Sequence, residues 1–237
     1  MSVSQPLESV PVPAHFYRGA TQDPHQRRRH RVILSQLNGL QGRVLDYGCG
    51  FGDITWAISQ SHADVRGVDV DPRRVAFARA QYPGLEFSQC RSDGLDFPAQ
   101  AFDIVTSVVV LPFVPDPSAY LQEIRRVLKP GGYVILASQA NDWLQRLAHR
   151  WRGGELYMDS PSSRPPGILW TPPPALLEDF LTQHGFRVLQ RRALFDPPFS
   201  NRKNAGDVLG SLVALVGETL RIRSMAPYPV YLLQLAN

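Results

Sequence analysis

Hydrophobic and polar residues follow two different periods along this chain, and segments with the strand period alternate with segments that have the helix period. Short apolar runs rich in β-branched residues predict strands, whereas apolar residues repeated every three or four positions predict helices. We expect strands around residues 44–45, 65–71, 85–89, 101–111, 133–138, 186–190 and 228–235. We expect helices over residues 24–37, from residue 54 onward, and over 72–80, 118–128, 141–152, 172–184 and 204–221.

Strand and helix alternate as far as residue 138, which is typical of a parallel, doubly wound α/β sheet. The run 101–111 is apolar or small at nearly every position, as expected for a parallel strand covered on both faces. The segment Lys129-Pro-Gly-Gly132 is expected to end one helix and turn the chain into the next strand. Asp71 and Thr171 are expected to cap the helices that follow them.

A glycine-rich stretch lies where the first strand meets its helix, with the sequence Asp46-Tyr-Gly48-Cys-Gly50-Phe-Gly52. Glycine at every second position allows backbone angles that a side chain would forbid, and it lets a ligand lie against the main chain. A dinucleotide fingerprint needs its third glycine at position 53, which is Asp53 here, so that pattern does not match. The stretch therefore predicts another kind of nucleotide site in an open α/β sheet, and a tight turn without a ligand is the alternative.

Acidic residues follow at the ends of the next two strands. Asp69 lies near the end of the second strand, where a carboxylate can accept hydrogen bonds from both ribose hydroxyls of a nucleoside. Asp93 and Gly94 follow the third strand; the carboxylate could accept from the exocyclic amine of adenine, and the glycine could let the ring approach. An ordinary Asp–Gly turn is the alternative for this pair.

Composition narrows the classes of partner. The net charge of +4 and the isoelectric point near 9.3 permit nucleic-acid binding without arguing for it. The basic run at 27–31 has no interleaved aromatic residues, so we interpret it as a solvated helix face. Cys49 and Cys90 form no CxxC pair, so we expect no metal site and a reducing, cytoplasmic setting. No signal peptide is apparent, and the longest apolar run, 104–111, is far short of the ~20 residues that a membrane helix needs.

The chain divides into two parts on this interpretation. Residues 1–38 form an N-terminal arm and helix that we expect to act as a lid, and residues 39–237 form the main domain. Residues 153–174 are rich in proline and glycine but also carry large apolar side chains. We predict that this segment covers a substrate pocket, and a solvated excursion is the alternative.

Five short motifs occur in order: the glycine stretch, Gly67-Val-Asp-Val-Asp71, Asp93-Gly94, Phe102-Asp-Ile-Val105 and Leu128-Lys-Pro-Gly-Gly132. The series closely resembles the class I S-adenosylmethionine (SAM) methyltransferases of the UbiE-like, type 11 group. The resemblance is strong over about residues 40–140 and weaker through Trp170-Thr-Pro and His184-Gly-Phe186. It implies a Rossmann-like, doubly wound α/β fold. The seven-stranded sheet would be mostly parallel, with an antiparallel last strand beside the sixth and helices on both faces.

The same resemblance implies SAM as the cofactor and S-adenosylhomocysteine as its product. Gly48 and Gly50 would line the methionine and ribose portion, and Val70 and Asp93 would contact the adenine. The backbone around Ser107 and Val108 would bind the methionine amine. The cofactor-binding residues implied are Asp46, Gly48, Cys49, Gly50, Asp69, Val70, Asp93, Gly94, Ser107 and Val108.

The turn after the fourth strand departs from the group, which often has a histidine where this chain has Phe113. A general base therefore cannot be carried over to this position. Other polar residues expected near the pocket are His15, Tyr17, Asn141, Asp142, His149 and Tyr157, none of which is singled out as essential. Methyl transfer from a sulfonium needs in-line alignment, and it needs a base only if the acceptor is protonated.

The function expected is methyl transfer from SAM to oxygen, nitrogen or carbon of a small, partly apolar acceptor. Two alternatives remain: an RNA or protein methyltransferase on the same fold, and a non-catalytic SAM-binding module. The absence of an Asn-Pro-Pro-Tyr-type motif after the fourth strand counts against N6-adenine chemistry. The identity of the acceptor and the oligomeric state stay open.

Overall fold

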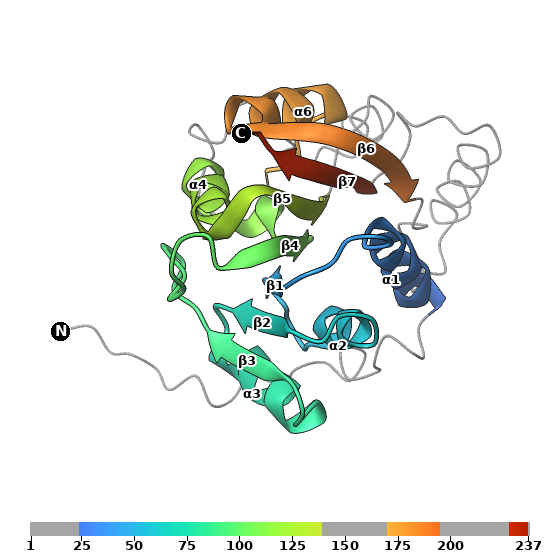
Figure 1. Ribbon diagram of the computed structural model, residues 1–237, viewed down its shortest axis with the longest axis vertical. Helices are drawn as coiled ribbons and strands as arrows, with labels where there is room; N and C mark the ends of the chain where they lie inside the picture. The colour runs from blue at the N-terminus through green and yellow to red at the C-terminus, as the bar shows by residue number, and fades with distance from the viewer. Residues whose placement is uncertain (1–23, 139–169, 195–227, 237) are drawn as a thin grey trace, which may run out of the picture.

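Seven strands form one mixed sheet in the computed structural model, which describes residues 24–138, 170–194 and 228–236 (Figure 1). The strands are β1 (Val44–Tyr47), β2 (Val65–Asp69), β3 (Glu86–Gln89), β4 (Phe102–Val108), β5 (Leu128–Ala137), β6 (Phe186–Leu194) and β7 (Tyr228–Leu235). Their order across the sheet is β3-β2-β1-β4-β5-β7-β6. Strands β1 to β5 run parallel, whereas β7 pairs antiparallel with both β5 and β6. The predicted doubly wound sheet and the antiparallel last strand beside the sixth are confirmed.

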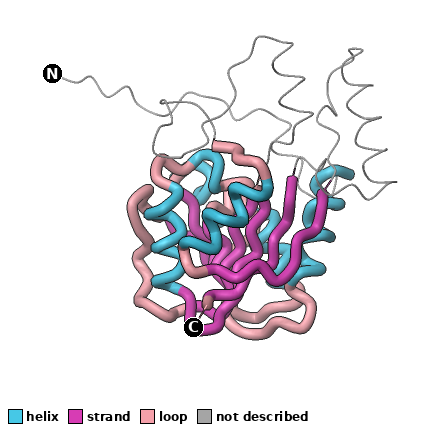
Figure 2. Tube along the Cα trace, turned by 90° about the horizontal axis from the view of Figure 1, so that it is seen from above, coloured by secondary structure: helices cyan, strands magenta, loops and turns pink. Residues whose placement is uncertain are grey.

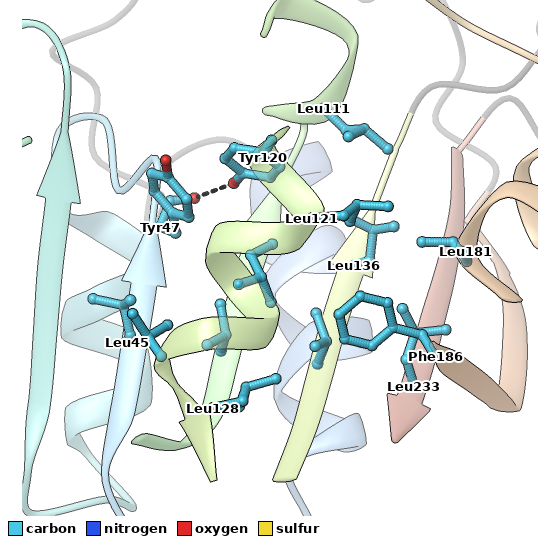
Figure 3. Packing of buried hydrophobic residues seen from close by; sticks show 14 of the residues in the cluster. Leu45, Tyr47, Leu111, Tyr120, Leu121, Leu128, Leu136, Leu181, Phe186 and Leu233 are labelled. Atoms are coloured by element: carbon cyan, nitrogen blue, oxygen red, sulfur yellow. Dashed lines mark hydrogen bonds between the residues drawn. The ribbon is translucent and has the colours of Figure 1, made fainter. Parts of the chain in front are cut away.

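Helices cover both faces of this sheet (Figures 1 and 2). The described helices are α1 (Pro24–Gln36), α2 (Asp53–Ser59), α3 (Pro72–Gln81), the short 3₁₀ helix η3 (Leu111–Phe113), α4 (Pro117–Val127) and α6 (Pro174–Gln183). Helices α1 and α2 bury Ile33 and Ile58 against one face of the central strands. Helices α4 and α6 bury Ile124 and Leu181 against the other face, where Figure 3 shows the packing. Each fully buried aliphatic side chain of this kind contributes about 1.5–3 kcal/mol of hydrophobic free energy.

Helix α4 shows how the local sequence sets an element. Asp116 accepts hydrogen bonds from the backbone N–H groups of Ser118 and Ala119 at 2.9 and 3.0 Å, and Pro117 occupies the first turn. Tyr120 and Ile124 lie four residues apart and are both buried, so the helix presents one apolar face to the sheet. Asp71 likewise caps α3, with Arg73 N–H donating at 2.9 Å, which confirms that prediction.

Several predicted boundaries were wrong, among them the end of the second strand, which is Asp69 rather than Asp71. The fourth strand ends at Val108 rather than Leu111, because Val109 takes a left-handed backbone conformation with φ of 58°. Helix α4 ends at Val127, and Leu128 already belongs to β5. Helix α6 begins at Pro174 with Pro173 at its N-cap position and no side-chain cap, so Thr171 does not cap it.

The Lys129–Gly132 segment therefore lies inside β5 instead of turning the chain before it. The pairing of β4 with β5 slips between Phe102 and Ile104, which marks a bulge at this point. A Cβ on Gly132 would lie 2.9 and 3.0 Å from the carbonyl oxygens of Lys129 and Asp103, so the bulge requires glycine there. Glycine was recognised as a turn residue in the sequence, but its actual role is close backbone approach within a strand.

Several predictions concern residues outside the described ranges. These are the arm at 1–23, the helices at 141–152 and 204–221, and most of the covering loop at 153–174. Helix α1 is described, and its Ile33, together with Leu37 just after the helix, packs into the core beside Val44. The lid role of the N-terminal part and the covering role of the loop stay predictions.

Candidate functional site

The strand order reverses between β1 and β4, and that reversal marks the usual ligand crevice of an open α/β sheet. The two strands pair only as far as Asp46 and Thr106. Beyond that pair β4 continues beside β5 alone, up to Val108 and Ala137. The carboxyl ends of β1 and β4 therefore separate where the sequence predicts the site.

The three glycines after β1 do three different jobs. A Cβ on Gly52 would meet Phe87 and Ala78 at 2.8 and 3.0 Å, so this glycine allows close packing on β3 and α3. A Cβ on Gly48 would overlap the side chain of Val110, which comes from the segment after β4. Gly50, with φ of 56°, has nothing within 4 Å of its Cβ position, so it alone borders open space. The sequence predicted a bare main chain at all three positions, and the structure leaves it open at one.

Asp69 lies at the end of β2 beside this open glycine. Its Oδ2 accepts a hydrogen bond from the Gly50 N–H at 2.9 Å, and its Oδ1 accepts one from the Asp71 N–H at 2.9 Å. The carboxylate therefore holds the loop after β1 to the loop after β2. The residue is only 5% exposed. Each carboxylate oxygen retains acceptor capacity, since a carboxylate offers about four lone-pair sites in all. The next residue, Val70, is 52% exposed and offers an apolar surface beside the carboxylate.

The Asp93–Gly94 turn is held from helix α4. Glu123 accepts the Leu95 N–H at 2.8 Å, and Arg126 donates to the carbonyl oxygens of Leu95 and Phe97 at 3.0 and 2.7 Å. The Arg126 guanidinium, which bonds Glu123 at 2.6 Å, lowers the pKa of that carboxyl. The Asp93 side chain is exposed and accepts from Arg91 at 2.9 Å. The turn is thus fixed in place while its carboxylate faces outward.

Asp46 differs from the other predicted site residues because it is 1% exposed. Thr55 of α2 donates to its Oδ2 at 2.7 Å, and Thr106 of β4 donates to its Oδ1 at 2.9 Å. Burial raises the pKa of Asp46 to about 6, against the opposing effect of the two threonine hydroxyls. The carboxylate therefore ties β1 to α2 and β4, and its role toward a cofactor stays a prediction.

Ser107 and Val108 end β4 on the far side of the crevice. The Ser107 side chain is fully buried and bonds the Tyr120 hydroxyl at 2.9 Å, so only its backbone is placed to serve a ligand. Val109 follows with φ of 58°, a conformation that is a true outlier for a β-branched residue and costs about 1–3 kcal/mol. Its N–H donates to the Ala137 carbonyl at 2.7 Å, which helps to hold the strained turn.

Among the remaining candidates that the structure describes, none is a base poised for catalysis. Cys49 and Cys90 are free and buried, and burial raises the pKa of both thiols, that of Cys90 to about 12. Phe113, in η3 at the end of β4, is 59% exposed. His15, Tyr17, Asn141, Asp142, His149 and Tyr157 lie outside the described residues. Among the residues that the structure describes, no three His, Cys, Asp or Glu side chains gather as metal ligands.

Sequence reasoning missed the residues that hold the site together. Thr55, Thr106, Tyr120, Glu123 and Arg126 supply the bonds to Asp46, Ser107 and the Leu95 turn. Tyr120 could have been found, because it lies four residues before Ile124 and so shares the buried face of the helix. The pairing of Glu123 with Arg126 at helical spacing was a further signal.

Comparison with known proteins agrees with this geometry. Residues 45–136 match the family described as a methyltransferase domain. A ubiquinone biosynthesis O-methyltransferase of Cronobacter sakazakii is 34% identical over 121 residues, which cover 47% of this chain and 50% of the relative. The chain thus spans about half the length of the curated relatives it matches.

Solved structures show the same fold at low identity. A chain in the complex of the Haloferax volcanii Trm112 methyltransferase activator with a putative methyltransferase matches with a TM-score of 0.66 and 21% identity. That match covers 92% of this chain and 94% of the other. The [4+2]-cyclase SpnF matches with a TM-score of 0.62 and 20% identity, covering 89% and 82%. The fold is therefore shared with a protein named for a different reaction, so the fold alone does not fix the chemistry.

Proposed function

We propose that this chain, which carries a class I SAM-dependent methyltransferase domain of the UbiE-like, type 11 group, methylates a small, partly apolar acceptor. The observation that carries the proposal is the open main chain at Gly50 directly beside the buried carboxylate of Asp69. An adenosyl group needs such a pair: a surface without side chains and an acceptor for its ribose hydroxyls.

The described residues fit the cofactor at each end. Asp69 would accept from the ribose, and Val70 with the fixed Asp93 turn would border the adenine. The backbone of Gly48 and of Ser107–Val108 would hold the methionine end across the crevice. When bound, SAM supplies a methyl group already activated on a sulfonium. The protein's part is then alignment, which in favourable cases is worth about 7–11 kcal/mol.

The acceptor class follows from the surroundings of the crevice. The Phe113 ring, exposed in η3 after the carboxyl end of β4, offers apolar contact to the acceptor. The relatives' name, ubiquinone biosynthesis O-methyltransferase, favours transfer to oxygen on a small molecule. No helix that the structure describes is long and apolar enough to cross a membrane. The two buried, unpaired cysteines fit the cytoplasmic setting that we propose.

Two measurements test the proposal in sequence. Isothermal titration with S-adenosylhomocysteine should give saturable one-site binding, which Asp69→Asn abolishes because an amide nitrogen would face one of the two backbone N–H donors. Asp71→Asn is the matched control, since asparagine caps α3 as well as aspartate does. A lack of binding to wild type at high micromolar ligand would overturn the proposal.

The second measurement follows methyl transfer by mass spectrometry from SAM to a panel of phenols, amines and enolisable ketones. Turnover on a phenol is expected. Salt-sensitive transfer to transfer RNA or to a protein instead would replace the small-molecule acceptor. Cofactor binding with no turnover on any acceptor would favour a non-catalytic SAM-binding module.

A further inference from the structure

A buried hydroxyl occupies the point where β1 and β4 part. The next residues after the last paired positions are Tyr47 and Ser107. The Tyr120 hydroxyl of α4 lies between them, 3.3 Å from the Tyr47 carbonyl oxygen and 2.9 Å from Ser107 Oγ; Figure 3 shows its bond to Tyr47. One side chain from the neighbouring layer therefore replaces the main-chain bond that would otherwise continue the sheet.

The direction of these hydrogen bonds follows from the groups present. A carbonyl oxygen only accepts hydrogen bonds, so the single O–H of Tyr120 donates to the Tyr47 carbonyl. Ser107 must then donate to the Tyr120 oxygen. Ser107 is fully buried, and Tyr47 and Tyr120 are 4% and 5% exposed, so solvent does not compete for these partners. The Tyr120 ring also packs on the Tyr47 ring with centroids 4.4 Å apart, which fixes the hydroxyl in place.

The bridge sits at the root of the crevice. Gly48 follows Tyr47, and Val108 follows Ser107, so the two bridged residues directly precede the two walls proposed to hold the methionine end. Val110 packs against Gly48 from the β4 side, which limits how far the walls can shift relative to each other. The Asp69 and Asp93 regions that would hold the adenosyl part belong to other loops, whereas the described hydrogen bonds of the Tyr120 hydroxyl go to Tyr47 and Ser107.

We propose that Tyr120 is a positioning residue that sets the separation of β1 and β4 for the amino-acid end of SAM. The proposal rests on the proposed function, since it concerns the same crevice. It assigns Tyr120 no contact with the cofactor. Its effect passes through the Tyr47 carbonyl and Ser107 to the backbone at Gly48 and Val108.

Two ligands separate this role from general loosening of the fold. S-adenosylhomocysteine carries the amino-acid end, whereas 5′-methylthioadenosine keeps the adenosyl and sulfur parts but lacks it. In Tyr120→Phe the Kd for S-adenosylhomocysteine should rise about tenfold, as for the loss of one buried hydrogen bond, while that for 5′-methylthioadenosine changes less than about twofold. Ser107→Ala keeps the bond from Tyr120 to Tyr47, so the same selective effect should appear at about threefold.

Tyr133→Phe is the matched control. Its hydroxyl bonds Gln234 at 3.4 Å on the same sheet, beside Ile104 near the start of β4 and far from the crevice. It should leave both dissociation constants unchanged. If Tyr120→Phe does not fold, Ser107→Ala decides alone. Equal effects on the two ligands, or no effect on either, would overturn the inference. Failure of wild type to bind S-adenosylhomocysteine would instead overturn the proposed function.

Discussion

The buried carboxylate of Asp46 should cost the protein stability at neutral pH, and replacing it with asparagine should recover that free energy. Asp46 is 1% exposed and has no cationic partner among the residues that the structure describes; its bonds come from the hydroxyls of Thr55 and Thr106. Burial raises its pKa from 3.8 to about 6. The folded protein therefore binds more protons than the unfolded chain between these values. Stability from this group is full below about pH 4 and is lost as the pH rises to 6.

The size of the effect follows from the shift. A shift of about two pKa units, at 1.36 kcal/mol per unit, corresponds to about 3 kcal/mol. Solvent does not screen this effect, because the carboxyl group is buried. Asparagine can satisfy the same partners without a charge. Its oxygen accepts from Thr55, its amide donates to Thr106, and the Thr106 hydroxyl turns to the Leu45 carbonyl 3.5 Å away. We expect Asp46→Asn to be more stable than wild type by about 3 kcal/mol above pH 7.

Urea unfolding of both proteins between pH 4.5 and pH 8 measures this difference. The advantage of the variant should grow from about pH 4 to pH 6 and stay constant above pH 7. The contribution of His30 cancels in this comparison, because the residue is present in both proteins. Burial lowers its pKa to about 4, so its contribution to stability rises with pH, opposite to that of Asp46. A variant that is less stable at pH 8, or whose advantage does not change with pH, would refute the reasoning.

Asp103→Asn is the control with the opposite sign. Burial works to raise the pKa of Asp103, but bonds from Lys129 at 2.7 Å and from the Arg43 N–H at 2.8 Å outweigh it and lower the pKa. A carboxyl with a lowered pKa stabilises the fold above its unfolded value and loses that contribution as the pH falls. This variant should be less stable than wild type at pH 8 and approach it in acid.

Two further outcomes follow from the backbone and from burial. Gln100→Gly should raise the free energy of unfolding, measured by urea denaturation, by about 1 kcal/mol. This exposed residue has φ of 56°, and glycine adopts that angle without strain. A loss of stability would contradict this prediction. Ellman's reagent at pH 8 should react with neither cysteine in the native protein and with both after unfolding, since Cys49 and Cys90 are buried. A fast thiol in the native state would contradict the described packing.

Local patterns carried most of the fold prediction. The Val44–Leu45 strand, the Asp71 cap and the position of Asp69 depend on neighbours in sequence, and the structure has all three where they were expected. The end of α4 was misplaced because β5 begins at Leu128, where Lys129 reaches Asp103 on the adjacent strand. That contact joins residues distant in sequence, so no local pattern signals it.

The site followed the same division. Acidic residues at strand ends could be located from the sequence, but the different roles of Gly48, Gly50 and Gly52 could not. Those roles depend on Val110, from the segment after β4, and on Phe87 of β3. The bridge through Tyr120 also joins three separate elements. A hydrophobic pattern predicts that Tyr120 is buried, but it does not predict where the hydroxyl finds its partners.

The measurement that tests the cradle most directly compares two glycine-to-alanine variants by titration with S-adenosylhomocysteine. Gly39 and Gly50 both have positive φ, 81° and 56°, and neither has an atom within 4 Å of its Cβ position. Alanine should therefore destabilise the two variants by similar amounts, about 1–2 kcal/mol each. Only Gly50→Ala places its methyl group in the proposed adenosyl site, so its Kd should rise by at least about tenfold while that of Gly39→Ala stays at the wild-type value. Equal affinity in the two variants would show that the cofactor does not lie against Gly50.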